Sequence, residues 1–177
     1  MGTKGWHHRG YLPHFDGWGI SQHVVFRLFD SVPPNERDGD DVLDRCLGSA
    51  LMRDANCARI VAEALLHGDG RRYALQAWCV MPNHVHALIA TGAETALGQI
   101  VHAWKRFTAR RINQKLGRTG PVWAKDYFDR FIRNEEHFET TKSYIERNPV
   151  VAGLCDVPQA WPFSSAGRRE EPPKGSK

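Results

Sequence analysis

The 177-residue sequence contains only four cysteines, and no two of them form a C-x-x-C pair. This pattern argues against a disulfide framework and a cysteine-based zinc site, so we expect reduced, mostly buried thiols. The sequence also lacks an apolar run long enough to span a membrane. Its N-terminal residues, MGTKGWHHRGYLPHF, lack the apolar segment of a secretory signal, and we expect a cytoplasmic protein.

Acidic residues are missing from one long stretch of the chain. Residues 95–125 contain no Asp or Glu, although the net charge of the whole chain is only +4. The positive residues in this stretch are Lys105, Arg106, Arg110, Arg111, Lys115, Arg118 and Lys125. Most charge runs are solvated helix faces. A block of this length without acidic partners nevertheless favours a surface that binds a polyanion such as nucleic acid.

The remaining composition is ordinary for a globular protein, with 41% hydrophobic and 25% charged residues. A chain of this length is sufficient for one domain with a substantial core. We assign that single domain to residues 1–166 and expect residues 167–177 to form a disordered tail.

The spacing of apolar residues predicts the order strand, helix, strand, strand, helix, strand, helix. The expected strands are residues 20–29, 72–80, 84–90 and 122–132, and the expected helices are residues 54–67, 95–116 and 135–147. Residues 1–19 show no periodicity and predict an irregular arm. Pro149 is expected to end the last helix at Asn148. This order favours an α+β fold, with helices packed on an antiparallel sheet of ferredoxin-like or RRM-like topology.

The stretch WCVMPNHVHALIA, residues 78–90, contains the most informative pair of side chains. Alternate residues of a strand share one face, so His84 and His86 are expected to project side by side while Val85 points into a core. Neutral imidazole is the commonest protein metal ligand, and the pair therefore offers half of a metal site. An isolated His-x-His is more often a pair of structural histidines held by carbonyls.

The last expected helix supplies two further candidates, Tyr144 and Asn148. Residues four apart share one helix face, so a phenol and an amide oxygen would project together. Two imidazoles and one amide oxygen leave coordination positions for substrate, and a neighbouring tyrosine can attack a phosphate. The alternative is a packed aromatic and a helix C-cap, and spacing alone leaves both interpretations open. Tyr127 is a weaker candidate nucleophile, because its strand-like segment contains no ligand partner.

Two motifs together, MPNHVHALI and YIERNPVVAGL, resemble the REP-associated tyrosine transposases. That group is a branch of the insertion-sequence-200-like transposases within the HUH endonuclease superfamily. The segments HRGYLPHF, QHVVFRL, WKRFTARRIN, VWAKDYFDRFIR and WPFSSA also resemble family segments and follow the family order. The resemblance implies the fold of an HUH nuclease.

The resemblance implies that His84, His86 and Asn148 bind a divalent ion, Mg²⁺ or Mn²⁺, and that Tyr144 is catalytic. The implied activity is metal-dependent cleavage and rejoining of single-stranded DNA beside REP-like hairpins, through a 5′-phosphotyrosine and a free 3′-hydroxyl. Such a protein would be a monomer or homodimer, associated with the nucleoid when bound to DNA. Lys105, Arg106, Arg110 and Arg111 would contact DNA phosphates.

Two alternatives stay open beside the transposase. One is a non-catalytic protein that binds single-stranded nucleic acid on the same fold. The other is a metal-dependent hydrolase of a different phosphodiester, in which the tyrosine is only structural.

Overall fold

The computed structural model describes residues 5–8, 13–16, 19–37, 39–92 and 94–168. A four-stranded antiparallel sheet with strand order β4-β5-β3-β6 lies at the centre of the fold. The strands are β3 (Ser21–Arg27), β4 (Tyr73–Val80), β5 (His84–Thr91) and β6 (Phe128–Phe131). The helix α2 (Ala55–His67) connects β3 to β4, and α3 (Leu97–Leu116) connects β5 to β6. This connectivity is ferredoxin-like and confirms the predicted α+β fold.

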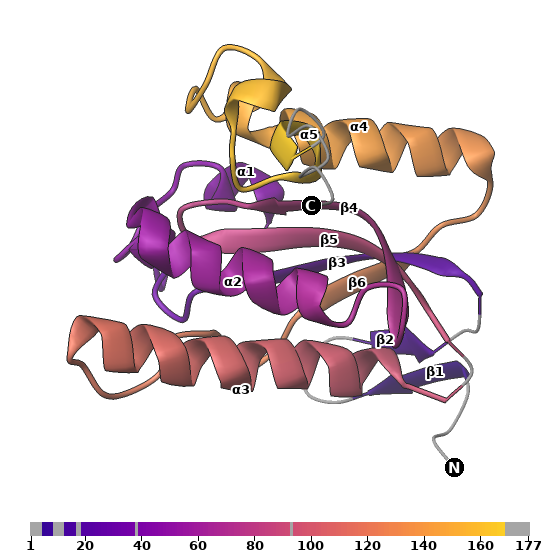
Figure 1. The fold of residues 1–177 in the computed structure, drawn as a ribbon, viewed down its shortest axis with the longest axis horizontal. Helices are drawn as coiled ribbons and strands as arrows, with labels where there is room; N and C mark the ends of the chain where they lie inside the picture. The colour runs from indigo at the N-terminus through magenta and orange to yellow at the C-terminus, as the bar shows by residue number, and fades with distance from the viewer. Residues whose placement is uncertain (1–4, 9–12, 17–18, 38, 93, 169–177) are drawn as a thin grey trace, which may run out of the picture.

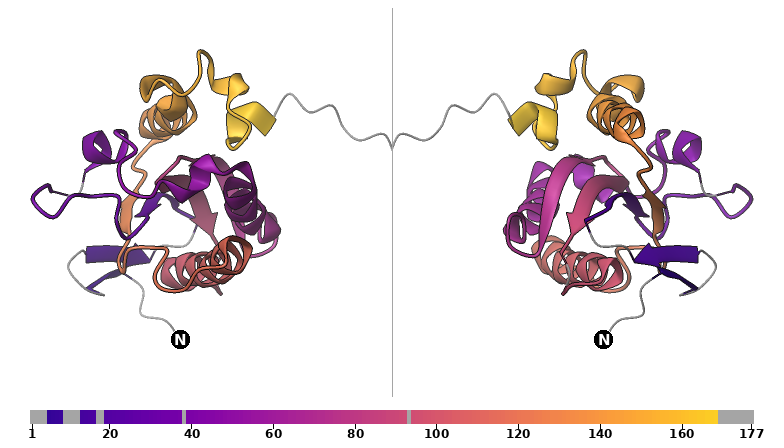
Figure 2. Two further views of the ribbon diagram at one scale, coloured as in Figure 1. Left: turned by 90° about the vertical axis from the view of Figure 1, so that its left-hand side faces the viewer. Right: turned by 90° about the vertical axis from the view of Figure 1, so that its right-hand side faces the viewer.

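The helices cover the two faces of the sheet separately. Figure 1 shows α2 and α3 on one face and α4 (Glu135–Val151) across the other, where it packs over β4 and β5. The two side views in Figure 2 show the same three layers. The basic helix α3 and the tyrosine-bearing helix α4 therefore lie on opposite sides of the sheet. Among the described residues, no helix has both the length and the apolar character needed to cross a membrane.

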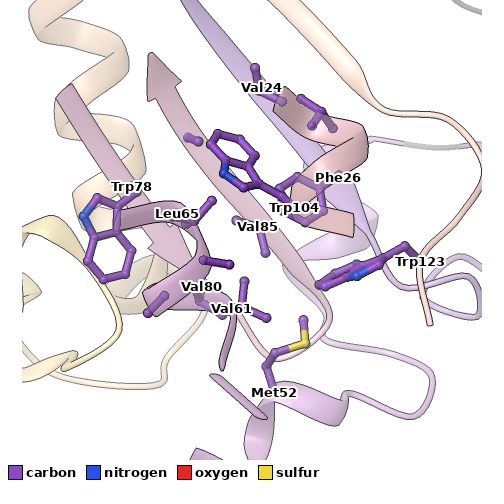
Figure 3. Packing of buried hydrophobic residues seen from close by; sticks show 14 of the residues in the cluster. Val24, Phe26, Met52, Val61, Leu65, Trp78, Val80, Val85, Trp104 and Trp123 are labelled. Atoms are coloured by element: carbon purple, nitrogen blue, oxygen red, sulfur yellow. The ribbon is translucent and has the colours of Figure 1, made fainter. Parts of the chain in front are cut away.

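The side chains of β5 alternate between these two layers, as predicted. Val85 belongs to the main core between the sheet and the helices α2 and α3, where Figure 3 shows it near Val61 and Leu65. Trp104 also lies in this core, 5% exposed, and its indole nitrogen donates to the Tyr73 hydroxyl at 3.0 Å. His84 and His86, by the same alternation, face α4.

Side-chain caps set the beginnings of α2 and α4, within one residue of the starts expected at 54 and 135. The carboxylate of Asp54 accepts hydrogen bonds from the amides of Asn56 at 2.7 Å and Cys57 at 3.3 Å, at the start of α2. The Asn134 side chain accepts from the amide of His137 at 2.8 Å, at the start of α4. Both caps satisfy amides that have no partner within the helix.

The predicted end of the last helix is wrong, because α4 continues through Pro149 to Val151. Proline removes one amide hydrogen and so deletes one hydrogen bond of the ladder. The following turn still closes, since the amides of Ala152 and Leu154 donate to the carbonyls of Asn148 at 2.9 Å and Pro149 at 2.8 Å. One missing bond near a helix end is therefore tolerated here.

Other segments also differ from the sequence prediction. The last strand, β6, is shorter than the predicted residues 122–132. Outside it, an isolated bridge joins Trp123 to Leu28, and the amide of Ile132 donates to the carbonyl of Ser21 at 2.8 Å. Within the arm predicted to be irregular, β1 (Gly5–His8) and β2 (Pro13–Asp16) form an antiparallel pair. Most of the predicted tail lies outside the described residues, and the domain limit at residue 166 stays a prediction. The short elements are α1 (Asp40–Leu43), η1 (Leu51–Arg53), η2 (Pro158–Ala160) and α5 (Ser165–Arg168).

The C-terminal segment, residues 158–168, runs along the outer edge of β4 and also contacts α4. The amide of Val80 donates to the carbonyl of Phe163 at 2.8 Å, and the amide of Trp78 donates to the Ser165 hydroxyl at 3.2 Å. The same hydroxyl donates to the carboxylate of Glu146 on α4 at 2.9 Å. This segment therefore links the edge of the sheet to the helix that carries Tyr144.

We predict that Leu65→Ala lowers the free energy of unfolding by about 2–5 kcal/mol, because Leu65 is fully buried in the main core. Leu116→Ala is the matched control: Leu116 is 39% exposed at the end of α3, and its loss should change stability by less than about 0.5 kcal/mol. Urea unfolding followed by circular dichroism measures both values, and equal effects would contradict the assigned core.

Candidate metal and tyrosine site

Two fully buried histidines, His84 and His86, lie on β5 beneath α4, with their Nε2 atoms 2.9 Å apart. Two nitrogen ligands at about 2.1 Å from one octahedral ion, at right angles to each other, are themselves about 3 Å apart. The two Nε2 atoms therefore already have the separation of neighbouring ligands.

A hydrogen bond identifies the tautomer of His84. Its Nδ1 lies 2.7 Å from Oδ1 of Asn83, while the amide nitrogen of Asn83 donates to the carbonyl of Leu47 at 3.3 Å. Because the Asn83 oxygen faces the imidazole and can only accept, Nδ1 of His84 carries the hydrogen. The lone pair of His84 then lies on Nε2, which faces His86.

His23, on β3, supports the second imidazole in the same way. Its Nε2 lies 3.0 Å from Nδ1 of His86, and the two rings stack with centroids 5.2 Å apart. Because Nε2 of His84 is an acceptor, its 2.9 Å hydrogen bond to His86 takes the hydrogen on Nε2 of His86, and Nδ1 of His86 then accepts from His23. In the other tautomer, Nδ1 of His86 would donate to His23 and the Nε2 lone pair of His86 would be available to a metal ion. No sequence motif indicates this role for His23, since its contact depends on the strand register that pairs Val25 with His86.

Burial keeps these imidazoles neutral. Desolvation lowers the pKa of His84 to about 3 and that of His86 well below its ordinary value, with His84 and His23 lowering the latter further. Desolvation, together with the charges of Arg130 and His137, lowers the pKa of His23 to about 4. A cation arriving at neutral pH would therefore not have to displace protons from the two ligands.

Tyr144 and Asn148 on α4 complete this side of the sheet. The Tyr144 ring stands edge-on to His86, with centroids 5.5 Å apart, and its centroid is 6.1 Å from that of His23. Asn148 lies one turn further along the same helix and is fully buried, yet neither of its amide atoms hydrogen-bonds to any described residue. A buried amide without partners costs about 1–3 kcal/mol. Such an amide fits a site where its oxygen binds an ion, and Asn148 is not the helix C-cap, which is Ala152.

Asp44 is a further candidate ligand, which was not among the residues predicted from the sequence. Its Oδ1 lies 3.7 Å from Nε2 of His84, and the ligating atoms of Asp44, His84 and His86 all lie within 4.8 Å of one another. A carboxylate added to two imidazoles and an amide oxygen makes a donor set suited to a hard divalent ion. No motif spacing signals Asp44, because it lies in a turn far upstream of the histidines.

The residues predicted to contact DNA are on the other side of the sheet. Arg106, Arg110 and Arg111 are exposed on α3, whereas the histidines face α4, the helix that carries Tyr144, on the opposite side of the sheet (Figure 1). Lys105 is engaged within the protein: its Nζ donates to two carbonyls of the 125–126 segment at 2.9 and 3.3 Å, and desolvation lowers its pKa to about 8. The alternative tyrosine, Tyr127, packs against the main core.

A family model described as Transposase IS200 like matches residues 57–148, just over half of the chain. The matched range contains β4, β5, α3, β6 and most of α4, including His84, His86, Tyr144 and Asn148. The chain belongs to the IS200-like transposase family. This confirms the resemblance found in the two sequence motifs.

One similar sequence and one similar structure carry a more specific description. A Haemophilus influenzae protein, named as a REP-associated tyrosine transposase, is 28% identical over 101 residues, which are 51% of this chain and 57% of that protein. The match thus spans little more than half the length of the curated relative. The solved structure of a REP-associated tyrosine transposase bound to a REP hairpin has a TM-score of 0.62 and 17% identity, and the match covers 90% of this chain and 84% of that one. This likeness supports the fold.

We predict that Asn148→Leu raises the free energy of unfolding of the metal-free protein by about 1–2 kcal/mol, because it removes a buried amide that hydrogen-bonds to no described residue. Asn83→Leu is the matched control. Asn83 is equally buried, but its amide bonds to both His84 and the Leu47 carbonyl, so the same change should destabilise the protein. Denaturant unfolding in EDTA measures both, and destabilisation by Asn148→Leu would contradict the interpretation.

Proposed function

We propose that this IS200-like transposase is a metal-dependent endonuclease that cleaves and rejoins single-stranded DNA beside REP-like hairpins. The observation that carries this proposal is the position of Tyr144 beside the His84–His86 pair, with the buried amide of Asn148 one turn away. The preference for hairpins is supported by the two REP-associated relatives, one of which was solved with a REP hairpin.

In the proposed reaction, the phenol oxygen of Tyr144 attacks the scissile phosphorus. A bond forms between the tyrosine oxygen and phosphorus, and the bond from phosphorus to the 3′ oxygen breaks. The phenol loses its proton, and the departing oxygen gains one to become a 3′-hydroxyl. The 5′ end stays on Tyr144 as a phosphotyrosine ester. Since one phosphodiester replaces another, a 3′-hydroxyl can reverse the step and rejoin strands without an external energy source.

The ion, Mg²⁺ or Mn²⁺, would be held by His84, His86, Asn148 and Asp44. When bound, a divalent ion polarises the phosphate and offsets negative charge in the transition state. Asn83 and His23 orient the imidazoles through their Nδ1 atoms.

One chain provides both the imidazoles and the tyrosine helix. Tyr144 lies beside His86 of its own chain, and the C-terminal segment links α4 to the edge of the same sheet. We therefore propose that a monomer contains a complete site, and that a homodimer would contain two.

We predict a covalent adduct between the wild-type protein and a hairpin oligonucleotide with single-stranded flanks in the presence of Mn²⁺. Tyr144→Phe should abolish the adduct, because it removes the nucleophilic oxygen. Tyr127→Phe should retain it. A denaturing gel with labelled DNA measures both, and labels on each side of the cut identify the 5′ linkage.

Other outcomes of this experiment identify the alternatives. Strand cleavage that persists in Tyr144→Phe would point to a hydrolase with a structural tyrosine. Hairpin binding by the wild type without cleavage would point to a non-catalytic binding protein. The exposed arginines on α3 are the observation that favours this alternative.

We predict that His84→Ala abolishes Mn²⁺ binding and DNA cleavage while hairpin affinity stays within about twofold, because the imidazole is buried away from the surface. His23→Leu should weaken Mn²⁺ affinity by about 10–100-fold, as it removes the partner that orients His86. The exposed His102→Leu is the control. Isothermal titration calorimetry measures Mn²⁺ affinity, and an unchanged value for His23→Leu would remove its positioning role.

A further inference from the structure

The sheet face that carries the histidines is only partly covered. The helix α4 packs over β4 and β5, while β3 and β6 on the same side extend beyond it (Figures 1 and 2). The register pairs Val25 with Phe128 and His23 with Arg130. Directly paired residues share one face, so Phe128 and Arg130 lie on the histidine side of the sheet. Phe128 is 40% exposed, and Arg130 is exposed too.

Phe128 and Arg130 form a positively charged cation–π pair. The guanidinium carbon of Arg130 lies 5.6 Å from the centroid of the Phe128 ring. No carboxylate of a described residue pairs with Arg130 or with Arg133. Unpaired nucleobases stack on exposed aromatic rings and guanidinium planes, and sheet aromatics are a recurring platform for them. An exposed ring and an unpaired guanidinium therefore fit a base and its phosphate.

Arg130 also lines a hollow of about 350 Å³ between β6 and the beginning of α4. The hollow is lined by Arg130, Arg133, Asn134, Glu136, His137 and Thr140. Two guanidinium groups and one carboxylate make its permanent charge positive. His137 lies seven residues before Tyr144 and so on the same side of α4. The hollow and the candidate nucleophile are thus on one side of one helix.

The same surface leads directly to the site. Arg130 is paired across the strands with His23, and the His23 ring lies 6.1 Å from the Tyr144 ring and 5.2 Å from the His86 ring. The exposed arginines of α3 are on the opposite face of the sheet. A strand whose phosphate reaches Tyr144 therefore meets the residues of β6 before it can meet those of α3.

We propose that Phe128, Arg130, Arg133 and His137, the strand-binding face, hold the unpaired DNA that flanks the scissile phosphate. Phe128 stacks one base, and the two arginines contact the backbone. This inference rests on the proposed function for its substrate. The surface on β6 and α4 that binds single-stranded DNA is thus distinct from the basic surface of α3.

The test compares a blunt hairpin with the same hairpin carrying single-stranded extensions on its 5′ or its 3′ side. Fluorescence anisotropy in EDTA measures binding without cleavage. Phe128→Ala and Arg130→Gln should each weaken binding of the extended hairpin by roughly tenfold. Binding of the blunt hairpin should stay within about twofold. Phe128→Trp preserves an aromatic ring and should retain the affinity for the extension.

Arg110→Gln is the matched control for charge, because it removes the same group from the opposite face. In Arg110→Gln, the ratio of the affinity for the extended hairpin to the affinity for the blunt hairpin should stay unchanged. Unaltered thermal melting of each variant excludes unfolding. Ultraviolet cross-linking of an extension that contains 5-iododeoxyuridine should mark the peptide that contains Phe128. Cross-links confined to α3, or extension affinities unchanged in Phe128→Ala and Arg130→Gln, overturn the proposal.

Adduct formation and extension binding together distinguish failure of the nuclease function from failure of the strand-binding face. Binding of the extension that depends on Phe128, without an adduct on Tyr144 in Mn²⁺, would support the strand-binding face and refute the nuclease. An adduct on Tyr144 together with extension binding that is indifferent to Phe128 would refute only the face.

Discussion

The packing of α4 against β5 is the contact on which the site depends. It removes His84 and His86 from water and so keeps both imidazoles neutral. The same contact places the Tyr144 ring against His86 and buries the Asn148 amide. The candidate metal ligands and the candidate nucleophile thus share one interface, in which Ile145 packs with residues of β4 and β5. Any movement of α4 away from the sheet would therefore take both Tyr144 and Asn148 away from the two imidazoles.

The two faces of the sheet divide stability from function. The main core, between the sheet and the helices α2 and α3, contains most of the buried apolar side chains. The other face buries three imidazoles, which hydrogen-bond to one another and to Asn83. It also buries the Asn148 amide, which bonds to no described residue and is therefore costly in a protein interior. A robust core on one side allows such groups on the other, as is common where function opposes stability.

Local periodicity explains which parts were predictable from sequence. The histidine pair follows from strand alternation, and the pairing of Tyr144 with Asn148 follows from helical spacing, since both depend only on neighbouring residues. His23 and Asp44 were not found, because their positions depend on strand register and on a distant turn. The exposure of Phe128 depends on where α4 stops covering the sheet. The predicted helix end at Asn148 was wrong, because the preference against helical geometry before proline takes no account of the hydrogen bonds that close the turn after Pro149.

The C-terminal segment has a consequence for assembly as well as for α4. An edge strand exposes backbone amides and carbonyls that invite pairing with another chain. Along β4, the amides of Val80 and Trp78 are already bonded to Phe163 and Ser165. The half of this edge nearest the histidines is therefore closed to a foreign strand. The segment that links α4 to the sheet therefore also blocks strand pairing along this half of the β4 edge.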